Sequence, residues 1–132
     1  MPPVAPMSST PSAAADVLPG LASLFARDVR GELEPWGQRA GANEGDPQTA
    51  GRILFEGQGM VTGVWQCTPG GWDTVDRPAT EAMIFLEGRA RITPLGGEPV
   101  VFQAGDTFVL PKGWNGRWQV LETVRKFFVE VK

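Results

Sequence analysis

Glu81 is the residue of this chain whose type and setting best suit chemistry. It begins the apolar stretch EAMIFLEG, residues 81–88, in a sequence that contains no histidine and no tyrosine. Histidine is the commonest general base near neutral pH and the commonest transition-metal ligand, so any chemistry falls to carboxylates, amines, guanidinium groups, hydroxyls or a thiol. Strand residues alternate between faces, so Glu81 shares a face with Met83 and Phe85. Partial burial beside them would raise the pKa of the carboxyl group unless a cation or hydrogen-bond donors compensate.

Four residues could supply such a cation: Arg77, Arg89, Arg91 and Lys126. The sequence does not choose among them. In the stretch VRKFFVEV, Arg125 and Lys126 point to opposite faces of one strand, so one of the two faces the core side. A lysine buried among phenylalanines has a lowered pKa and can pair with Glu81 or act on a carbonyl group. At a sheet edge, a lysine would instead discourage aggregation. Glu81 and Lys126 are the candidate catalytic residues.

Tryptophan is frequent in a chain whose aromatic content is otherwise modest. Four of these residues are Trp65, Trp72, Trp114 and Trp118. A tryptophan at the mouth of a site offers a stacking wall for a sugar, a ring or a cation, whereas a buried one fills a core or a dimer interface. Trp114 falls in a predicted loop and is the strongest candidate for ligand binding. Trp72, Trp118 and Arg77 complete the candidate ligand-binding set.

Neither the cysteine nor the acidic residues indicate a cofactor. Cys67 is the single cysteine, and without a histidine to activate it we expect a buried, unreactive thiol. A lone cysteine also excludes an intrachain disulfide, which favours a reducing compartment and hence the cytoplasm. Asp73, Asp76 and Glu81 could supply an oxygen-only site for Mg²⁺ or Ca²⁺, but they lack the spacing of a dedicated cation loop. We therefore expect no metal and no cofactor.

The elements that must position these side chains are short strands. From Arg52 onward, apolar runs read as strands: RILFEG, MVTGVWQC, EAMIFLEG, RARIT, PVVF, TFVLP, RWQVL and VRKFFVEV. Turn-forming residues stand between them, including the pairs Glu87-Gly88 and Glu122-Thr123. Strands at this density, with no helical period among them, predict an all-β sandwich or barrel. AMIFL and TFVL are apolar on both faces, so we expect the N-terminal segment or a second subunit to cover the outer face, and a homodimer.

The 132 residues indicate one domain with a loose N-terminal part. Residues 1–18, rich in proline, serine and alanine, are expected to be disordered. Residues 19–51 are expected to form a short helix between Pro19 and Asp28 and then a loop, followed by the barrel domain at residues 52–132. The net charge of −3 argues against binding to nucleic acid or to an anionic membrane, and no stretch has the length of a membrane span. The expected partner is a small molecule.

Two segments carry a resemblance to a known family. Glu81 is followed after six intervening residues by Gly88. Gly105 is followed after five intervening residues by Pro111, and one further residue separates Pro111 from Gly113. This spacing resembles the two motifs of the cupin superfamily. With the stretch GVWQCTPGGW, residues 63–72, the sequence is similar to small single-domain cupins of the DUF861 or Cupin_3-like group, related to the cupin domain of ureidoglycine aminohydrolase. The resemblance covers roughly residues 52–132. It implies an all-β, cupin-type (RmlC-like) jelly-roll barrel, here with a short N-terminal helix or extended arm, and it implies that Glu81 faces into the barrel.

The same resemblance shows where this chain departs from metal-binding cupins. Their first motif places two histidines shortly before the glutamate, where this chain has Thr74-Val75-Asp76-Arg77. The histidine and asparagine positions of the second motif correspond to Gly116 and Val120. Of the four usual ligands, only Glu81 is present, so the metal chemistry of the family does not transfer.

Three functions remain open from the sequence. The first is a metal-independent cupin that binds a small polar metabolite in its barrel, with mild acid/base catalysis by Glu81 and a basic partner. The second is a non-catalytic accessory or binding module, which the missing catalytic set favours. The third, disfavoured by the lack of histidine, is a metalloenzyme like the ureide-processing relatives.

Overall fold

The computed structural model describes residues 16–18 and 20–132, and its elements are almost all strands. In chain order they are β1 (Asp16–Leu18), β2 (Leu21–Ser23), α1 (Ala26–Arg30), β3 (Glu34–Gln38), β4 (Ala42–Gly45), β5 (Gln48–Gly57), β6 (Met60–Cys67), β7 (Gly70–Thr74), β8 (Thr80–Pro94), β9 (Val100–Gln103), β10 (Thr107–Leu110) and β11 (Gly116–Val131). Disorder was expected over residues 1–18. Positions 1–15 lie outside the described residues, while Asp16–Leu18 pair with β2. The described part of the chain contains no helix long and apolar enough to cross a membrane.

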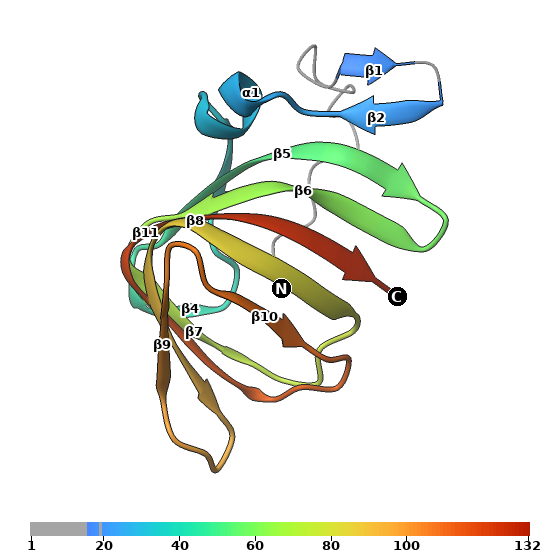
Figure 1. Ribbon diagram of the computed structural model, residues 1–132. Coiled ribbons are helices and arrows are strands. Elements are labelled where there is room, and N and C mark those ends of the chain that lie inside the picture. The colour runs from blue at the N-terminus through green and yellow to red at the C-terminus, as the bar shows by residue number, and fades with distance from the viewer. Residues whose placement is uncertain (1–15, 19) are drawn as a thin grey trace.

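The main sheet is antiparallel and curls around a common interior (Figure 1). Its strands follow the order β10-β8-β11-β6-β5-β3, with β7 also pairing with β11 and β4, and β9 pairing with β8. Strands distant in sequence therefore line one interior, and the predicted jelly-roll barrel is confirmed. The central strands β8 and β11 carry Glu81, Trp118 and Lys126, half of the candidate site residues.

β8 and β11 are each one long bent strand, so the prediction of two separate strands in each place is wrong. The expected turns at Glu87-Gly88 and Glu122-Thr123 are irregularities within the β8–β11 ladder, whose register shifts between Val120 and Lys126. Gly88 has a φ of +82°, and a Cβ atom there would collide with the Thr123 carbonyl group. A glycine is thus needed for this bend, which is why the sequence signal resembles that of a hairpin turn.

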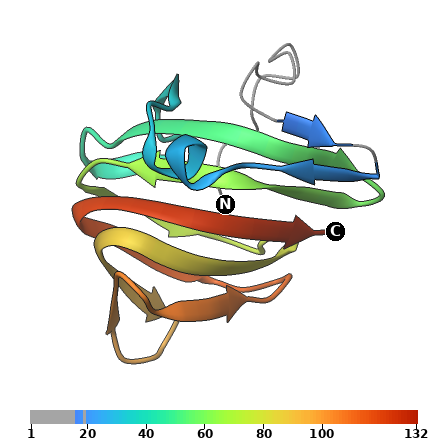
Figure 2. The same cartoon turned by 45° about the horizontal axis from the view of Figure 1, so that its top comes forward.

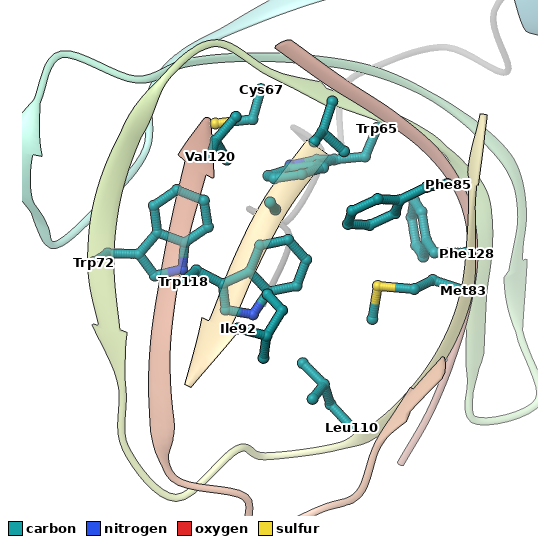
Figure 3. Close-up of a cluster of buried hydrophobic side chains, with 12 residues drawn as sticks. Trp65, Cys67, Trp72, Met83, Phe85, Ile92, Leu110, Trp118, Val120 and Phe128 are labelled. Carbon is teal, nitrogen blue, oxygen red and sulfur yellow. The ribbon is translucent and has the colours of Figure 1, made fainter. Parts of the chain in front are cut away.

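The inner face of the sheet forms the core. Glu81, Met83 and Phe85 are all buried, as strand parity predicted, whereas Ala82 and Ile84 on the other face are exposed. Figure 3 shows the apolar side chains converging from opposite walls of the barrel. The buried cluster consists of Trp65, Cys67, Trp72, Met83, Phe85, Ala90, Ile92, Leu110, Trp118, Val120, Val124 and Phe128.

Residues 20–33, which contain β2 and α1, form a segment that lies outside the barrel, over β5 and β6 (Figure 2). Two arginines on the outer face attach it: Arg52 donates to the carbonyl groups of Asp28 and Glu32, and Arg125 donates to those of Val29 and Gly31. This confirms that Arg125 and Lys126 face opposite sides. The same outer face remains open over β8 and β10, where Ile84 and Val109 are 38% and 55% exposed. Residues 20–33 therefore cover only part of it.

Two local predictions in residues 19–51 are wrong. The helix occupies Ala26–Arg30 rather than the stretch from Pro19 to Asp28, and β2 precedes it. The expected loop over residues 37–51 contains β4 and parts of β3 and β5, so the main sheet starts at Glu34 rather than at Arg52. β3 and β4 are mostly exposed, and their pairings contain register shifts, so backbone pairing forms them without an alternating apolar pattern.

Candidate functional site

Four charged side chains are buried together inside the barrel, where β8 begins and β11 ends. Arg77 Nη2 lies 2.8 Å from Glu81 Oε1 and 3.3 Å from Glu130 Oε2. Lys126 Nζ lies 2.7 Å from Glu81 Oε2. Each oxygen of Glu81 therefore has its own cation, and Arg77 links the two carboxylates. We call these four residues the buried charge cluster.

The register of β8 and β11 brings three members of this cluster together. Glu130 stands directly opposite Glu81, and Lys126 stands opposite Phe85. Because strand side chains repeat every two residues, Lys126, Phe128 and Glu130 share the inner face with Glu81. Two carboxylates facing each other across a ladder repel unless cations separate them, and Arg77 and Lys126 serve that purpose.

Arg77 comes from the loop between β7 and β8 and is held by backbone contacts. Its N–H donates to the Trp114 carbonyl group at 3.1 Å, and its carbonyl accepts from the Gly113 N–H at 2.7 Å. The preceding residue, Asp76, has a φ of +49° and receives support from Asn115 Oδ1, which accepts its N–H. Arg77 Nε donates to the Ala79 carbonyl group, which fixes the guanidinium group over Glu81. The loop thus adds a second cation beside Glu81, where the strands supply only Lys126.

Aromatic rings enclose the ammonium group of Lys126. Its Nζ atom lies 4.3 Å from the ring centre of Trp65 and 4.9 Å from that of Trp118. A cation over an indole face is attracted by the negative π surface, and this attraction strengthens when water is excluded. The indole rings thereby offset part of the cost of burying the charge.

Burial and charge shift the pKa values of this cluster in different directions. Burial opposes ionisation of Glu81, but Lys126 and Arg77 outweigh it, so the pKa of Glu81 lies below its ordinary value. Burial lowers the pKa of Lys126, although Glu81 acts against this. Burial, with the adjacent charge of Glu81, raises the pKa of Glu130. Glu130 is therefore better suited than Glu81 to exchange a proton near neutral pH.

Of the proposed basic partners, the structure brings Arg77 and Lys126 to Glu81. Arg89 instead pairs with Glu122 on the surface at 3.0 Å, and Arg91 donates to Gln119. Glu130 was missed by the sequence analysis, although it follows Lys126 by four residues in the same strand. That even spacing was an available signal for a shared face.

The candidate tryptophans occupy two different settings. Trp72 and Trp118 are each 1% exposed and stack on each other at a centroid distance of 5.7 Å, so they lie in the core and not at a mouth. Trp65 contacts both rings edge-on. Trp114 is half-buried, and its ring lies against Gly116. A ligand-binding role for any of these residues remains a prediction.

Arg39 is a further residue that the sequence analysis missed, because it fell in the expected loop. Its guanidinium group lies 4.7 Å from the ring centre of Trp72. Burial lowers the pKa of Arg39. The Cys67 thiol is buried as expected, and its Sγ atom donates to the Thr68 carbonyl group. Burial raises the pKa of Cys67 to about 12, which leaves the thiol protonated and unreactive at neutral pH.

The residues around Glu81 do not fit a divalent metal. Both oxygens of Glu81 already face cations, and Val120, which stands at a ligand position of the cupin motif, has no donor atom. Gly116, at the histidine position, has no space for a side chain because the Trp114 ring lies against it. Asp73 is exposed and forms an ion pair with Arg117, so it does not complete an oxygen-only site with Glu81. Within residues 16–18 and 20–132, no three His, Cys, Asp or Glu side chains form a group that could hold a metal ion.

The curled antiparallel sheet and its motif glutamate define this chain as a cupin-fold protein. More specifically, it belongs to the EutQ-like cupin domain family, whose sequence model matches residues 55–128. Among curated proteins, none is detectably similar to it in sequence.

Solved structures support the same assignment. A DUF861-family protein of unknown function from Pseudomonas syringae pv. tomato is 25% identical with a TM-score of 0.71, over 78% of this chain and 46% of that chain. This chain therefore spans about half the length of the Pseudomonas protein. The EutQ protein of Clostridium difficile is 16% identical with a TM-score of 0.71, over 87% and 90% of the two chains. Ectoine synthase from P. lautus is 20% identical with a TM-score of 0.57, over 63% of each chain. The latter two likenesses show a shared fold.

Proposed function

We propose that this chain is a metal-independent cupin that binds a small polar metabolite inside its barrel, at the buried charge cluster. The observation that carries this proposal is the cluster itself: Arg77, Glu81, Lys126 and Glu130 are at most 7% exposed. Burying charges is costly, and replacing such a cluster by apolar residues is often neutral or stabilising. A purely structural core has no need of it, whereas a binding site does.

Mild acid/base chemistry is the second part of the proposal. Glu81, held ionised between Lys126 and Arg77, would orient the substrate and stabilise positive charge. Glu130, whose pKa burial raises, adds a carboxyl group that can itself give or take a proton beside the shared Arg77 cation. This refines the role expected of Glu81 from the sequence, because its lowered pKa makes it a weak base.

A non-catalytic binding or accessory module is the alternative, and one observation favours it. Both oxygens of Glu81 are engaged by cations, which is typical of a structural ion pair. A ureide-type metalloenzyme is disfavoured, since the residues at the cupin metal positions do not fit a metal. Binding without turnover would distinguish the module from the enzyme.

The test is a thermal-shift screen of the untagged protein against ureides, amino acids, sugars, organic acids and divalent metals. A ligand that binds only the native state raises the melting temperature in a concentration-dependent way. Glu81→Gln keeps the side-chain volume and should abolish the response. Should Glu81→Gln fail to fold, Glu81→Gln/Lys126→Met removes both charges of the pair and serves in its place. A ligand whose effect is unchanged in either variant would place its site elsewhere and refute the proposal.

We also propose that the chain forms a homodimer through the open part of its outer face. Ile84, Val109 and Val131 are 38%, 55% and 46% exposed, and residues 20–33 leave them uncovered. Light scattering after size exclusion should give twice the chain mass, and Val109→Lys should give the monomer. A monomeric parent protein would refute this. The single cysteine, Cys67, keeps a reducing, cytoplasmic setting as our prediction.

A further inference from the structure

The buried groups that lack a hydrogen-bond partner in the barrel are nearly all donors. Among the described residues these are Arg39 Nε, Trp65 Nε1, Trp72 Nε1, Arg77 Nη1 and Trp118 Nε1, together with the Thr74 hydroxyl group. The one unpartnered acceptor by hydrogen-bond geometry, Glu81 Oε2, faces Lys126 Nζ at 2.7 Å. Buried polar groups in folded proteins are normally satisfied, and each that is not calls for an explanation. Here the deficit has one sign: acceptors are missing.

Three of these donors belong to a single packed group of rings. The centroids of Trp65, Trp72 and Trp118 lie 5.7–6.3 Å apart. Figure 3 shows all three indoles inside the barrel rather than in its wall. Each is 1% exposed, so water outside the barrel does not supply the acceptors. Arg39 lies over Trp72, and Lys126 lies over Trp65 and Trp118, so the cationic groups border the same rings.

The charged groups around these rings are positive in sum, which also favours a ligand that carries hydrogen-bond acceptors. Three cations, Arg39, Arg77 and Lys126, stand against two carboxylates, Glu81 and Glu130. Even with both carboxylates ionised, this leaves one positive charge in excess. The edges of aromatic rings, which carry the indole N–H groups, are also the positive part of the ring. A neutral or cationic ligand would leave this excess uncompensated.

We propose that the ligand of this barrel is a small organic monoanion of the carboxylate class, whose oxygens accept from the unpartnered indole N–H groups. This rests on the proposed function, because it names the chemical class of the metabolite at the same site. One carboxylate matches the single excess charge, and its two oxygens can accept several N–H donors at once. Its organic body meets the apolar faces of the tryptophans.

The proposal is tested with three probes that share one ring and differ in charge: benzoate, benzamide and benzylamine. Titration calorimetry at constant ionic strength should show saturable binding of benzoate, with benzamide and benzylamine at least about ten-fold weaker. The matching aliphatic series of butyrate, butyramide and butylamine covers the case in which the benzene ring is too large. If neither carboxylate binds while the corresponding amide or amine does, the proposal fails but the proposed function stands. If none of these probes nor any compound of the metabolite screen binds, both fail.

The location is tested by substitutions that remove one N–H group and keep an aromatic ring. Trp72→Phe and Trp118→Phe should each weaken carboxylate binding by about ten-fold, the loss expected for one hydrogen bond to a charged group. Trp36→Phe is the matched control, because Trp36 Nε1 already donates to Glu34. Nitrogen-edited NMR adds a readout in the parent protein: carboxylate should shift the indole N–H signals of Trp65, Trp72 and Trp118 and leave that of Trp36 in place. Shifts confined to Trp36 or Trp114 would overturn the assignment.

Discussion

Two arginine-centred clusters in this molecule have the same chemistry and nearly the same distances but differ in burial. Inside the barrel, Arg77 lies 2.8 Å from Glu81 and 3.3 Å from Glu130. On the outside, Arg117 lies 2.8 Å from Glu44 and 3.1 Å from Asp73. The side chains of Arg77 and Glu81 are fully buried, whereas that of Asp73 is 58% exposed. The distances alone therefore do not show which cluster contributes more to stability.

The difference lies in what replaces each interaction when it is broken. Water solvates the partners of Arg117 at once, and dissolved salt screens them, so exposed pairs contribute little. Within the barrel, a charge that loses its partner stays buried without solvation, which is strongly destabilising. The buried charge cluster is thus a fixed arrangement of charges suited to a site, while the outer cluster mainly joins β4, β7 and β11 at the surface.

The largest expected effect is that of Lys126→Met, which removes the ammonium group while keeping an unbranched side chain. Glu81 would then have Arg77 as its single cation, and the free energy of unfolding should fall by about 3–5 kcal/mol. Urea unfolding of the variant and the parent protein measures this difference. Native proteins have about 5–15 kcal/mol in total, so the variant should be close to its limit of stability.

Glu81→Gln/Lys126→Met supplies the control for this effect. If the loss comes from a buried unpaired charge, neutralising Glu81 as well should recover part of the stability lost in Lys126→Met. If the two single losses simply add in the double variant, the pair does not interact and the comparison between the clusters is unfounded.

The sequence predicted which side chains of the Glu81 strand face inward, but not which other charged residues join Glu81 there. The two-residue period placed Glu81 with Met83 and Phe85, because that regularity is local. The choice of Arg77 over Arg89 and Arg91 depends on how a loop closes against the Gly113–Trp114 turn, and such long-range contacts leave no local pattern. Glu130 shares its face with Lys126, but whether a glutamate on that face is buried depends on the long-range pairing of β11 with β8.

The same reasoning explains what was missed in the fold. The motif spacing was sufficient for the barrel, because turn glycines and strand lengths recur within it. Gly88 marks a sharp change of direction, and a hairpin turn and a bulge both require a glycine there. Only the close approach of the Thr123 carbonyl group to Gly88, a contact between two strands, distinguishes them. β3 and β4 lack apolar alternation because the core does not depend on their side chains.

An intermediate effect is expected from pH, and the two buried carboxylates should act in opposite directions. The folded-state pKa of Glu130 is raised, so its contribution to stability is present at low pH and is lost as the pH rises through that pKa. The pKa of Glu81 is lowered, so its contribution is present above its unfolded-state value and is lost as the pH falls through the folded-state pKa. Stability should therefore rise slightly as the pH falls through the raised pKa of Glu130, and it should fall in stronger acid, where Glu81 is protonated.

Urea unfolding between pH 3 and pH 8 measures this profile. Glu130→Gln should remove the rise, because glutamine does not titrate. The fall in acid should remain, because it comes from Glu81. A parent profile that shows no rise before the fall in acid would contradict the raised pKa of Glu130. A flat profile in strong acid would contradict the ion pairing of Glu81.

The smallest effect is expected on the outer cluster, from Arg117→Gln. Removing this guanidinium group breaks the contacts with Glu44 and Asp73, but water and neighbouring polar groups take their place. The loss of stability should be at most about a third of that in Lys126→Met.

In 1 M sodium chloride the screening length falls to about 3 Å, so the small difference between Arg117→Gln and the parent protein should nearly vanish. The deficit of Lys126→Met should persist at the same salt concentration, because dissolved salt screens a buried pair far less than an exposed one. Equal salt sensitivity of the two variants would mean that solvent reaches Lys126 as freely as it reaches Arg117, and the distinction between the clusters would then disappear.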